Sequence, residues 1–179
     1  MALITGFELA RPTGTCAASG DEIAVGDLFV ATLVERPGED KLERLDFSVA
    51  AWDSGARPET PLSLFGSWHT EMPEPNAQKQ PFIDADGMSD LFEQLGESDD
   101  PRRQAFRYLL TLIMARKRLL KIEGQRDGAM LVRLKGQALP PERGGDGPPF
   151  IEVTNPGLDD ETVASATEQL GQVLLMDEN

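Results

Sequence analysis

Short apolar runs separated by turn residues fill the first 72 residues of the chain. Asp27–Glu35 is rich in Val, Leu and Phe, and the Pro and Gly of the following RPGED suit a turn. Apolar side chains return among polar ones in Lys41–Val49, and Pro61–Met72 alternates between the two kinds. This pattern predicts an antiparallel β-rich half over residues 1–72.

Helical patterns predominate after a Pro-rich linker over residues 73–87. Met88–Gly96 places its apolar side chains on one helical face and ends at a glycine, so we expect a short helix there. This helical half covers residues 88–179. We expect two short strands in it, at Ala129–Leu134 and Phe150–Val153, with a loop over residues 140–149 between them. An amphipathic C-terminal helix is predicted over residues 158–175.

The longest predicted helix covers residues 101–122. Asp100 can cap it, Pro101 suits its first position, and Gly124 suits its end. Its apolar side chains fall on two nearly opposite faces, so we expect it to be packed on both sides at the centre of the core. One face comprises Phe106, Leu109, Leu110, Ile113 and Leu120, and the other comprises Tyr108, Leu112, Ala115 and Leu119.

The predicted elements make an α+β protein, and the chain is long enough for one real core or for two small lobes. The chain has 179 residues, of which 40% are hydrophobic, and no apolar run approaches the roughly 20 residues of a membrane span. The N-terminus lacks the pattern of a signal peptide. A single cysteine excludes an internal disulfide and fits a reducing compartment. We therefore expect one compact unit located in the cytoplasm.

Positive charge is concentrated in one segment of an otherwise acidic chain. The net charge is −14, yet Pro101–Gly124 holds seven of the 17 cations and no acid before Glu123. Four of these cations share one edge of the predicted helix: Arg103, Arg107, Arg118 and Lys121.

Three interpretations of these cations remain open. Cations near the end of a helix complement its dipole, and those near its start can pair with the seven acids of residues 84–100. Alternatively, the basic edge docks an acidic protein partner. A third interpretation is contact with RNA or DNA phosphates, which the acidic net charge and the lack of interleaved aromatics disfavour.

The stretch GTCAASGDEIAVGDLFV resembles half of a zinc ribbon, but it is degenerate. Cys16 is present, whereas Ser19 stands at the position of the second thiolate. Structural zinc needs four ligands, and Cys16 and His69 are the only Cys and His of the chain. We therefore expect no metal, and we interpret the stretch as a tight turn with a small buried thiol.

Other chemical signatures are weaker. FIDADGMSDLFE matches part of a calcium loop, but Phe82 occupies the first ligand position, and capping of a helix by Asp86 or Ser89 explains the acids more simply. No Gly-rich phosphate loop is present. Cys16 and His69 could form a nucleophile–base pair, so a small hydrolase or transferase stays open as an alternative.

Several blocks together resemble a family of small bacterial proteins of about this length: CAASG…VGDLFVATLVE, RLDFSVAAW, YLLTLIMARKRLLK and NPGLDDETVASATEQLGQVLL. They follow one another through most of the chain. The resemblance implies no activity, ligand or catalytic residue; it implies only that these blocks form one unit.

The sequence therefore predicts a cytoplasmic interaction protein, and it favours a non-enzymatic role over an enzymatic one. The predicted partner is acidic, and the predicted partner-binding residues are Arg103, Arg107, Arg118 and Lys121. No residue is assigned to catalysis, to a cofactor or to a metal. An RNA-associated factor and an enzyme with a site near Cys16 and His69 are the alternatives.

Overall fold

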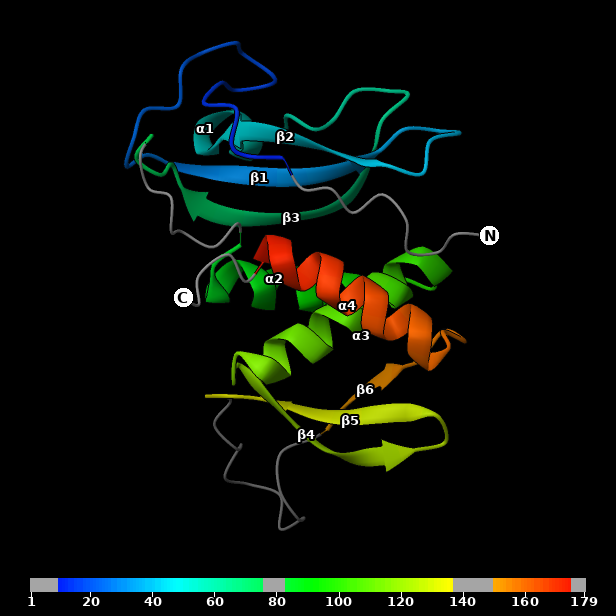
Figure 1. The fold of residues 1–179 in the computed structure, drawn as a ribbon. Coiled ribbons are helices and arrows are strands. Elements are labelled where there is room, and N and C mark those ends of the chain that lie inside the picture. Colours follow the sequence, from blue (N-terminus) through cyan, green and yellow to red (C-terminus); the bar gives the residue numbers. More distant parts are fainter. Residues whose placement is uncertain (1–9, 76–82, 137–149, 175–179) are drawn as a thin grey trace.

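Two small antiparallel sheets enclose a layer of helices (Figure 1). The computed structural model describes residues 10–75, 83–136 and 150–174. Strands come first along the chain and a helix comes last, so the predicted α+β class is confirmed. The loop predicted over 140–149 lies outside the described residues, as does part of the predicted linker.

The first sheet has the strand order β2-β1-β3 and confirms the strands predicted in the N-terminal half. Its strands are β1 (Leu28–Glu35), β2 (Leu42–Ser48) and β3 (Ser63–Glu71). Consecutive residues of β1 from Phe29 to Val34 are all buried, which shows that the central strand is covered on both faces. A short helix that the pattern did not predict, α1 (Val49–Asp53), follows β2.

The second sheet has the order β4-β5-β6. The strands β5 (Ala129–Leu134) and β6 (Ile151–Thr154) match the two predicted in this half. The third strand, β4 (Leu120–Arg126), was not predicted. A two-residue turn, Asp127–Gly128, joins β4 to β5, and both turn residues have positive φ, as in the hairpins that Asp-Gly favours.

Helix α2 (Ala85–Gly96) begins inside the segment predicted as a linker. The carboxylate of Asp84 accepts a hydrogen bond of 2.7 Å from the Gly87 N–H and caps the helix. The predicted caps, Asp86 and Ser89, were therefore wrong, by two and five residues. Both lie inside the helix, where the Ser89 hydroxyl donates to the Ala85 carbonyl at 3.0 Å.

Helix α3 (Pro101–Arg116) begins as predicted but ends six residues early. Asp100 accepts from the N–H groups of Arg102 and Arg103, both at 3.0 Å, so the predicted cap is confirmed. At the other end the N–H of Arg118 donates to the Ala115 carbonyl at 3.0 Å, and that of Leu119 donates to Met114 at 2.9 Å. This pair of bonds is the Schellman motif that terminates many helices.

The early end of α3 corrects the predicted helix over 101–122. In a Schellman motif the residue after the C-cap takes a left-handed conformation, for which glycine is usual. Here that residue is Arg118, with φ 61°. The motif therefore carries no glycine, and Gly124, the predicted end, lies in β4.

The burial of α3 agrees with one of its two predicted apolar faces. Phe106, Leu109, Leu110 and Ile113 are fully buried, whereas the opposite face is only half-buried against the core. Helix α4 (Asp160–Leu174) packs beside α3, as Figure 1 shows. Leu120 is buried too, but as the first residue of β4.

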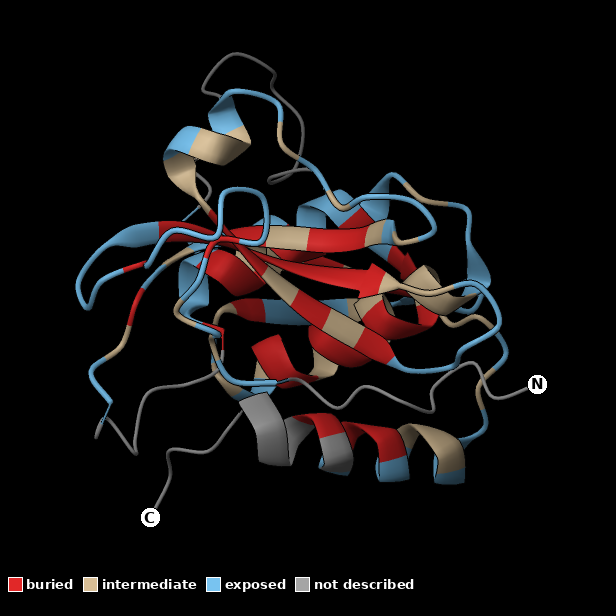
Figure 2. Cartoon of the chain, turned by 90° about the horizontal axis from the view of Figure 1, so that it is seen from above, coloured by how far each residue is buried: buried red, intermediate tan, exposed pale blue. Residues whose placement is uncertain are grey.

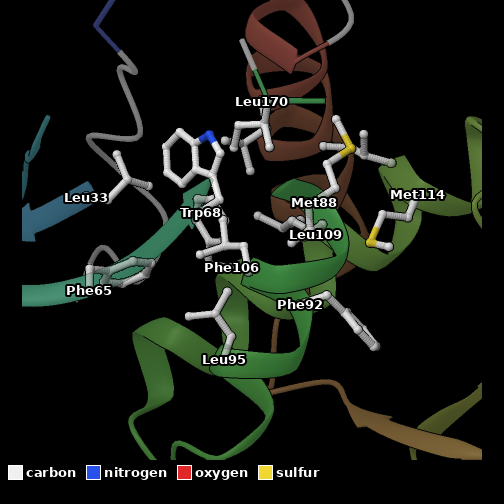
Figure 3. Close-up of a cluster of buried hydrophobic side chains, with 14 of the residues drawn as sticks. Leu33, Phe65, Trp68, Met88, Phe92, Leu95, Phe106, Leu109, Met114 and Leu170 are labelled. Carbon is white, nitrogen blue, oxygen red and sulfur yellow. The ribbon is translucent and has the colours of Figure 1, made fainter. Parts of the chain in front are cut away.

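Glycines let α2 approach the first sheet closely. A Cβ on Gly66 of β3 would lie 2.2 Å from Leu91 Cδ1, and one on Gly87 would lie 2.7 Å from Trp68 Cδ1. Phe65 of β3 meets Phe106 of α3 edge-on, with ring centroids 5.4 Å apart. Figure 3 shows these aromatic and aliphatic side chains converging between sheet and helices. In Figure 2 the buried positions gather accordingly on the inner sides of the strands and helices.

No helix in the described ranges is long and apolar enough to cross a membrane.

Candidate protein-interaction surface

The four predicted partner-binding residues do not share one helical edge. Arg103 and Arg107 lie on α3, Arg118 lies in the turn after it, and Lys121 lies on β4. The expectation of one shared helical edge was wrong because it rested on a helix that continues to residue 122, whereas α3 ends at Arg116. The structure divides the four into two cations that are bound within the fold, Arg103 and Arg107, and two at the surface, Arg118 and Lys121.

Arg103 is engaged within the fold. Its Nη2 lies 3.4 Å from a carboxylate oxygen of Glu35 on β1 and donates to the Leu64 carbonyl at 2.8 Å. Arg102 contacts the other oxygen of Glu35 at 3.2 Å. Internal pairing of these cations was one of the predicted interpretations, but the carboxylate that the structure supplies is Glu35 rather than an acid of residues 84–100.

Arg107 joins three elements. Its guanidinium donates to the Phe92 carbonyl of α2 at 3.1 Å and to the Glu152 carbonyl of β6 at 3.4 Å, and it lies 4.5 Å from the Phe92 ring centroid. Gly96 leaves room for it, because a Cβ there would lie 2.7 Å from the guanidinium. Burial lowers the pKa of Arg107, but an arginine starts so high that it stays charged. Arg107 is therefore a structural cation.

The surface cations gather where α3 ends and the second sheet begins. The N–H of Lys135 donates to the Leu119 carbonyl at 2.9 Å, which brings the end of β5 beside the turn after α3. Together these cations form what we call the basic cluster: Arg116, Lys117, Arg118, Lys121 and Lys135. Within the described residues only Lys121 forms an ion pair with a carboxylate, that of Glu123 at 3.0 Å, and its side chain is still 74% exposed.

Sequence reasoning placed two members of the basic cluster, Arg118 and Lys121, in the predicted site. It missed Lys135, which is distant in sequence and arrives through β5. A signal for β4 was nevertheless present, because Leu120, Lys121, Ile122 and Glu123 alternate apolar and polar residues as a strand does.

Arg118 is in a conformation that its residue type disfavours. Its φ of 61° lies in the left-handed region, where a side chain with a Cβ crowds the backbone. Arg118 is exposed, and its side chain makes no hydrogen bond or ion pair with a described residue. Strain of this kind at an exposed cation is a reason to look for function.

One aromatic side chain lies close to the cations of the second sheet. Phe150, which precedes β6, is 43% exposed, and the Arg133 guanidinium lies 5.4 Å from its ring centroid. Arg133 also lies 3.7 Å from Glu123. The ring thus already has a cation stacked on it.

Cys16 lies in a polar cradle under the first sheet. Its Sγ accepts from the Ser48 N–H at 3.3 Å and from the Ser48 hydroxyl at 3.6 Å. Burial by itself raises the pKa of this thiol, but hydrogen bonds from Ser19 and Ser48 outweigh burial. The net effect lowers the pKa from 9.0 to about 6. The predicted buried thiol in a turn agrees with this geometry: Cys16 is 1% exposed, and the Gly20 N–H donates to its carbonyl at 2.8 Å.

The structure does not bring Cys16 and His69 together. Cys16 contacts Ser48, which stands opposite Phe29 of β1, whereas His69 stands opposite Val30. Neighbouring residues of a strand point to opposite faces, so the side chains of Ser48 and His69 lie on opposite faces of the sheet. The Cys–His pair that a hydrolase or transferase would need is not formed.

Three or more His, Cys, Asp or Glu side chains in a metal-binding arrangement do not occur in the described part of the chain. Asp84, which stood at a calcium-loop position in the sequence, caps α2 instead.

Comparison of the chain with protein-family models, with curated proteins and with solved structures finds no match. The resemblance to small bacterial proteins therefore stays a prediction.

Proposed function

We propose that the protein is a non-enzymatic interaction protein of the cytoplasm that binds an acidic segment of a protein partner through the basic cluster. A buried, unpaired thiol at Cys16 is consistent with a reducing compartment. The proposal keeps the partner class predicted from the sequence and moves the binding surface. Arg118 and Lys121 remain in it, and Arg103 and Arg107 leave it because they are bound inside the fold.

Arg118 carries the proposal. A glycine would satisfy the Schellman turn without strain, yet the chain has an arginine there. Arg118 is exposed and belongs to the basic cluster, of whose other members Arg116, Lys117 and Lys135 make no ion pair with a described carboxylate. Like charges gathered in this way repel one another, and a bound anion relieves the repulsion.

A protein partner is favoured over nucleic acid by two features. The net charge of −14 repels a polyanion at long range, so binding depends on a small local surface and suits a short acidic segment. Binding of single-stranded RNA commonly uses free aromatic faces for base stacking, and the exposed Phe150 already has Arg133 on its ring.

Titration with two labelled polyanions tests the proposal. Fluorescein-labelled polyglutamate and an oligouridylate of equal length are titrated by anisotropy at about 0.15 M salt, where long-range repulsion is screened. We expect polyglutamate to bind more tightly than the oligouridylate. The double variant Arg118→Glu, Lys121→Glu should lower the affinity for polyglutamate by about tenfold or more.

The matched control is Arg11→Glu, because Arg11 is an exposed cation outside the basic cluster. It should leave the affinity for polyglutamate unchanged. Tighter binding of the oligouridylate, lost in the double variant, would replace the acidic protein partner with RNA. Absence of polyglutamate binding would end the proposal.

A further inference from the structure

The rest of the chain covers some edge strands of the two sheets and not others. A strand at the edge of a sheet leaves every second N–H and C=O group unpaired, and proteins usually cover such edges. The four edge strands here are β2, β3, β4 and β6.

Three of these edges are covered. The Ala17 N–H donates to the Asp46 carbonyl of β2 at 2.8 Å. Gln94 of α2 makes two hydrogen bonds to the Ser67 backbone of β3, at 3.1 and 2.7 Å. Arg107 donates to the Glu152 carbonyl of β6. Each contact places a side chain or a loop where a further strand would otherwise bind.

The fourth edge, β4, has no such contact from any described residue. Lys135 and Leu119 are hydrogen-bonded partners, and the pairing alternates along the ladder from there. The N–H and C=O of Ile122 therefore point away from β5, toward a side where no described strand lies. Lys121 and Ile122 are both exposed, in agreement with this geometry.

The two faces of β4 differ in chemistry. Ile122 stands opposite the buried Val132, so its side chain is on the face that meets α3, but it is 37% exposed at the margin of the sheet. Lys121, its neighbour, is on the outer face of a strand that begins two residues after Arg118. A strand added here would meet an apolar side chain on one face and cations on the other.

We propose that the partner segment adds a short strand at Leu120–Ile122, to the edge of β4 that no described residue covers, and that it alternates apolar and acidic residues. Its apolar side chains cover Ile122, and its acids face Lys121 and the basic cluster. The irregularity between Ile122 and Gly124 interrupts the ladder and limits the added strand to this end of β4. This inference rests on the proposed function, because it assigns a conformation to the same partner.

Charge selects the occupant of this edge. Extension of a sheet by backbone pairing is not selective by itself, and alternate side chains give it specificity. The cations beside β4 oppose a basic strand and favour an acidic one. A second copy of this chain is the competing occupant, and the test distinguishes it.

The test measures amide exchange at β4. A peptide of alternating Val and Glu, as long as β4, is added to the protein, and the exchange of backbone amides is followed by NMR. We expect the Ile122 amide to exchange at least about tenfold more slowly with the peptide bound. The Gln125 amide, which lies beyond the irregularity, should not change and serves as an internal control.

A side-chain variant provides an independent readout. Ile122→Ser should lower the affinity for the alternating peptide by about fivefold or more, because it removes apolar contact. It should leave polyglutamate binding unchanged, because it does not change the charge. Val25→Ser is the control, because Val25 is a 51% exposed apolar side chain in another part of the protein.

The outcomes separate the two proposals. If both peptides bind while the Ile122 amide exchanges as before, strand addition is wrong and the proposed function stands. If neither peptide binds, both fall. If the Ile122 amide is protected without peptide and the mass in solution doubles, the occupant of the edge is a second copy of the chain and the inference is overturned.

Discussion

At the scale of single residues, Arg118 and Cys16 hold states that their residue types do not favour. Arg118 has a left-handed backbone conformation, and the buried Cys16 has a pKa lowered to about 6. In each case the surroundings fix the state: a helix terminator fixes the first and a set of hydrogen bonds fixes the second. The state of Arg118 yields a prediction that distinguishes stability from binding. The state of Cys16 yields a prediction of how stability depends on pH.

Arg118→Gly should stabilise the protein and weaken its binding to the acidic partner. Glycine takes positive φ without steric strain, and we expect the free energy of unfolding to rise by about 0.5–1 kcal/mol. The same change removes one cation of the basic cluster, so the affinity for polyglutamate should fall. Urea denaturation and anisotropy measure the two effects.

Lys117→Gly is the matched control. Lys117 has φ −75°, where glycine brings no relief and only increases the entropy of the unfolded chain, so this variant should lose stability. Equal loss of stability in both variants would show that Arg118 is not strained.

Stability should rise with pH through the range in which Cys16 titrates. The folded pKa is lowered from 9.0 to about 6, so the thiolate stabilises the fold fully above pH 9 and this stabilisation is lost as pH falls through 6. Cys16→Ala should flatten that part of the profile of unfolding free energy against pH. The difference between the two profiles, measured by urea denaturation, isolates the contribution of Cys16. Parallel profiles would mean that the folded thiol keeps its ordinary pKa.

At the scale of elements, caps and close contacts decide where each helix lies. Helix α3 starts at the carboxylate of Asp100, and α2 lies against β3 because Gly66 has no side chain. Each feature depends on one residue, so both can be tested by single substitutions with matched controls.

Asp100→Ala should lower the free energy of unfolding by about 1 kcal/mol, because two N–H groups of α3 lose their acceptor. Asp99→Ala removes an equal charge that accepts no hydrogen bond from a described residue, so it should have a much smaller effect. Thermal or urea denaturation of the pair gives the difference. Similar losses in both variants would argue for a general charge effect and against the cap.

Gly66→Ala should destabilise the protein by about 1–3 kcal/mol, since the new methyl group would lie 2.2 Å from Leu91 Cδ1 and α2 would have to move. Gly124→Ala is the control, because nothing lies within 4 Å of a Cβ there. Denaturant midpoints of the two variants provide the comparison. A neutral Gly66→Ala would mean that α2 does not lie as close to β3 as the structure shows.

At the scale of the whole molecule, charge is distributed unevenly. The chain sums to −14, yet residues 116–135 hold seven cations and two acids. The basic cluster therefore lies at one end of an otherwise acidic protein, on the side of the second sheet in Figure 1.

Salt should act on folding and on binding in opposite directions. Screening relieves the self-repulsion of the acidic chain, so the urea midpoint should rise between low salt and about 0.15 M. The same screening weakens attraction between the basic cluster and an acidic segment, so the affinity for polyglutamate should fall over that range. A single set of salt titrations measures both. An affinity that is independent of salt would show that the contact is not electrostatic.

Much of the fold could be predicted from local pattern, and less of the candidate site could. The strands of the first sheet, β5, β6 and the starts of α3 and α4 follow from periodicity and from caps such as Asp100. The end of α3 could not be predicted, because the residue that terminates it is an arginine. Two of the four predicted site residues were therefore placed on a helix that does not reach them.

The sequence by itself determined the α+β class, the long apolar helix at its centre and the gathering of cations near that helix, because these follow from residue type and short-range spacing. Tertiary structure decided which of those cations are available. Arg102 pairs with Glu35, which lies 67 residues away in the chain, and Lys135 reaches the basic cluster through the pairing of β5 with β4. Exposure and pairing depend on neighbours that are distant in sequence, and only the folded chain brings those neighbours together.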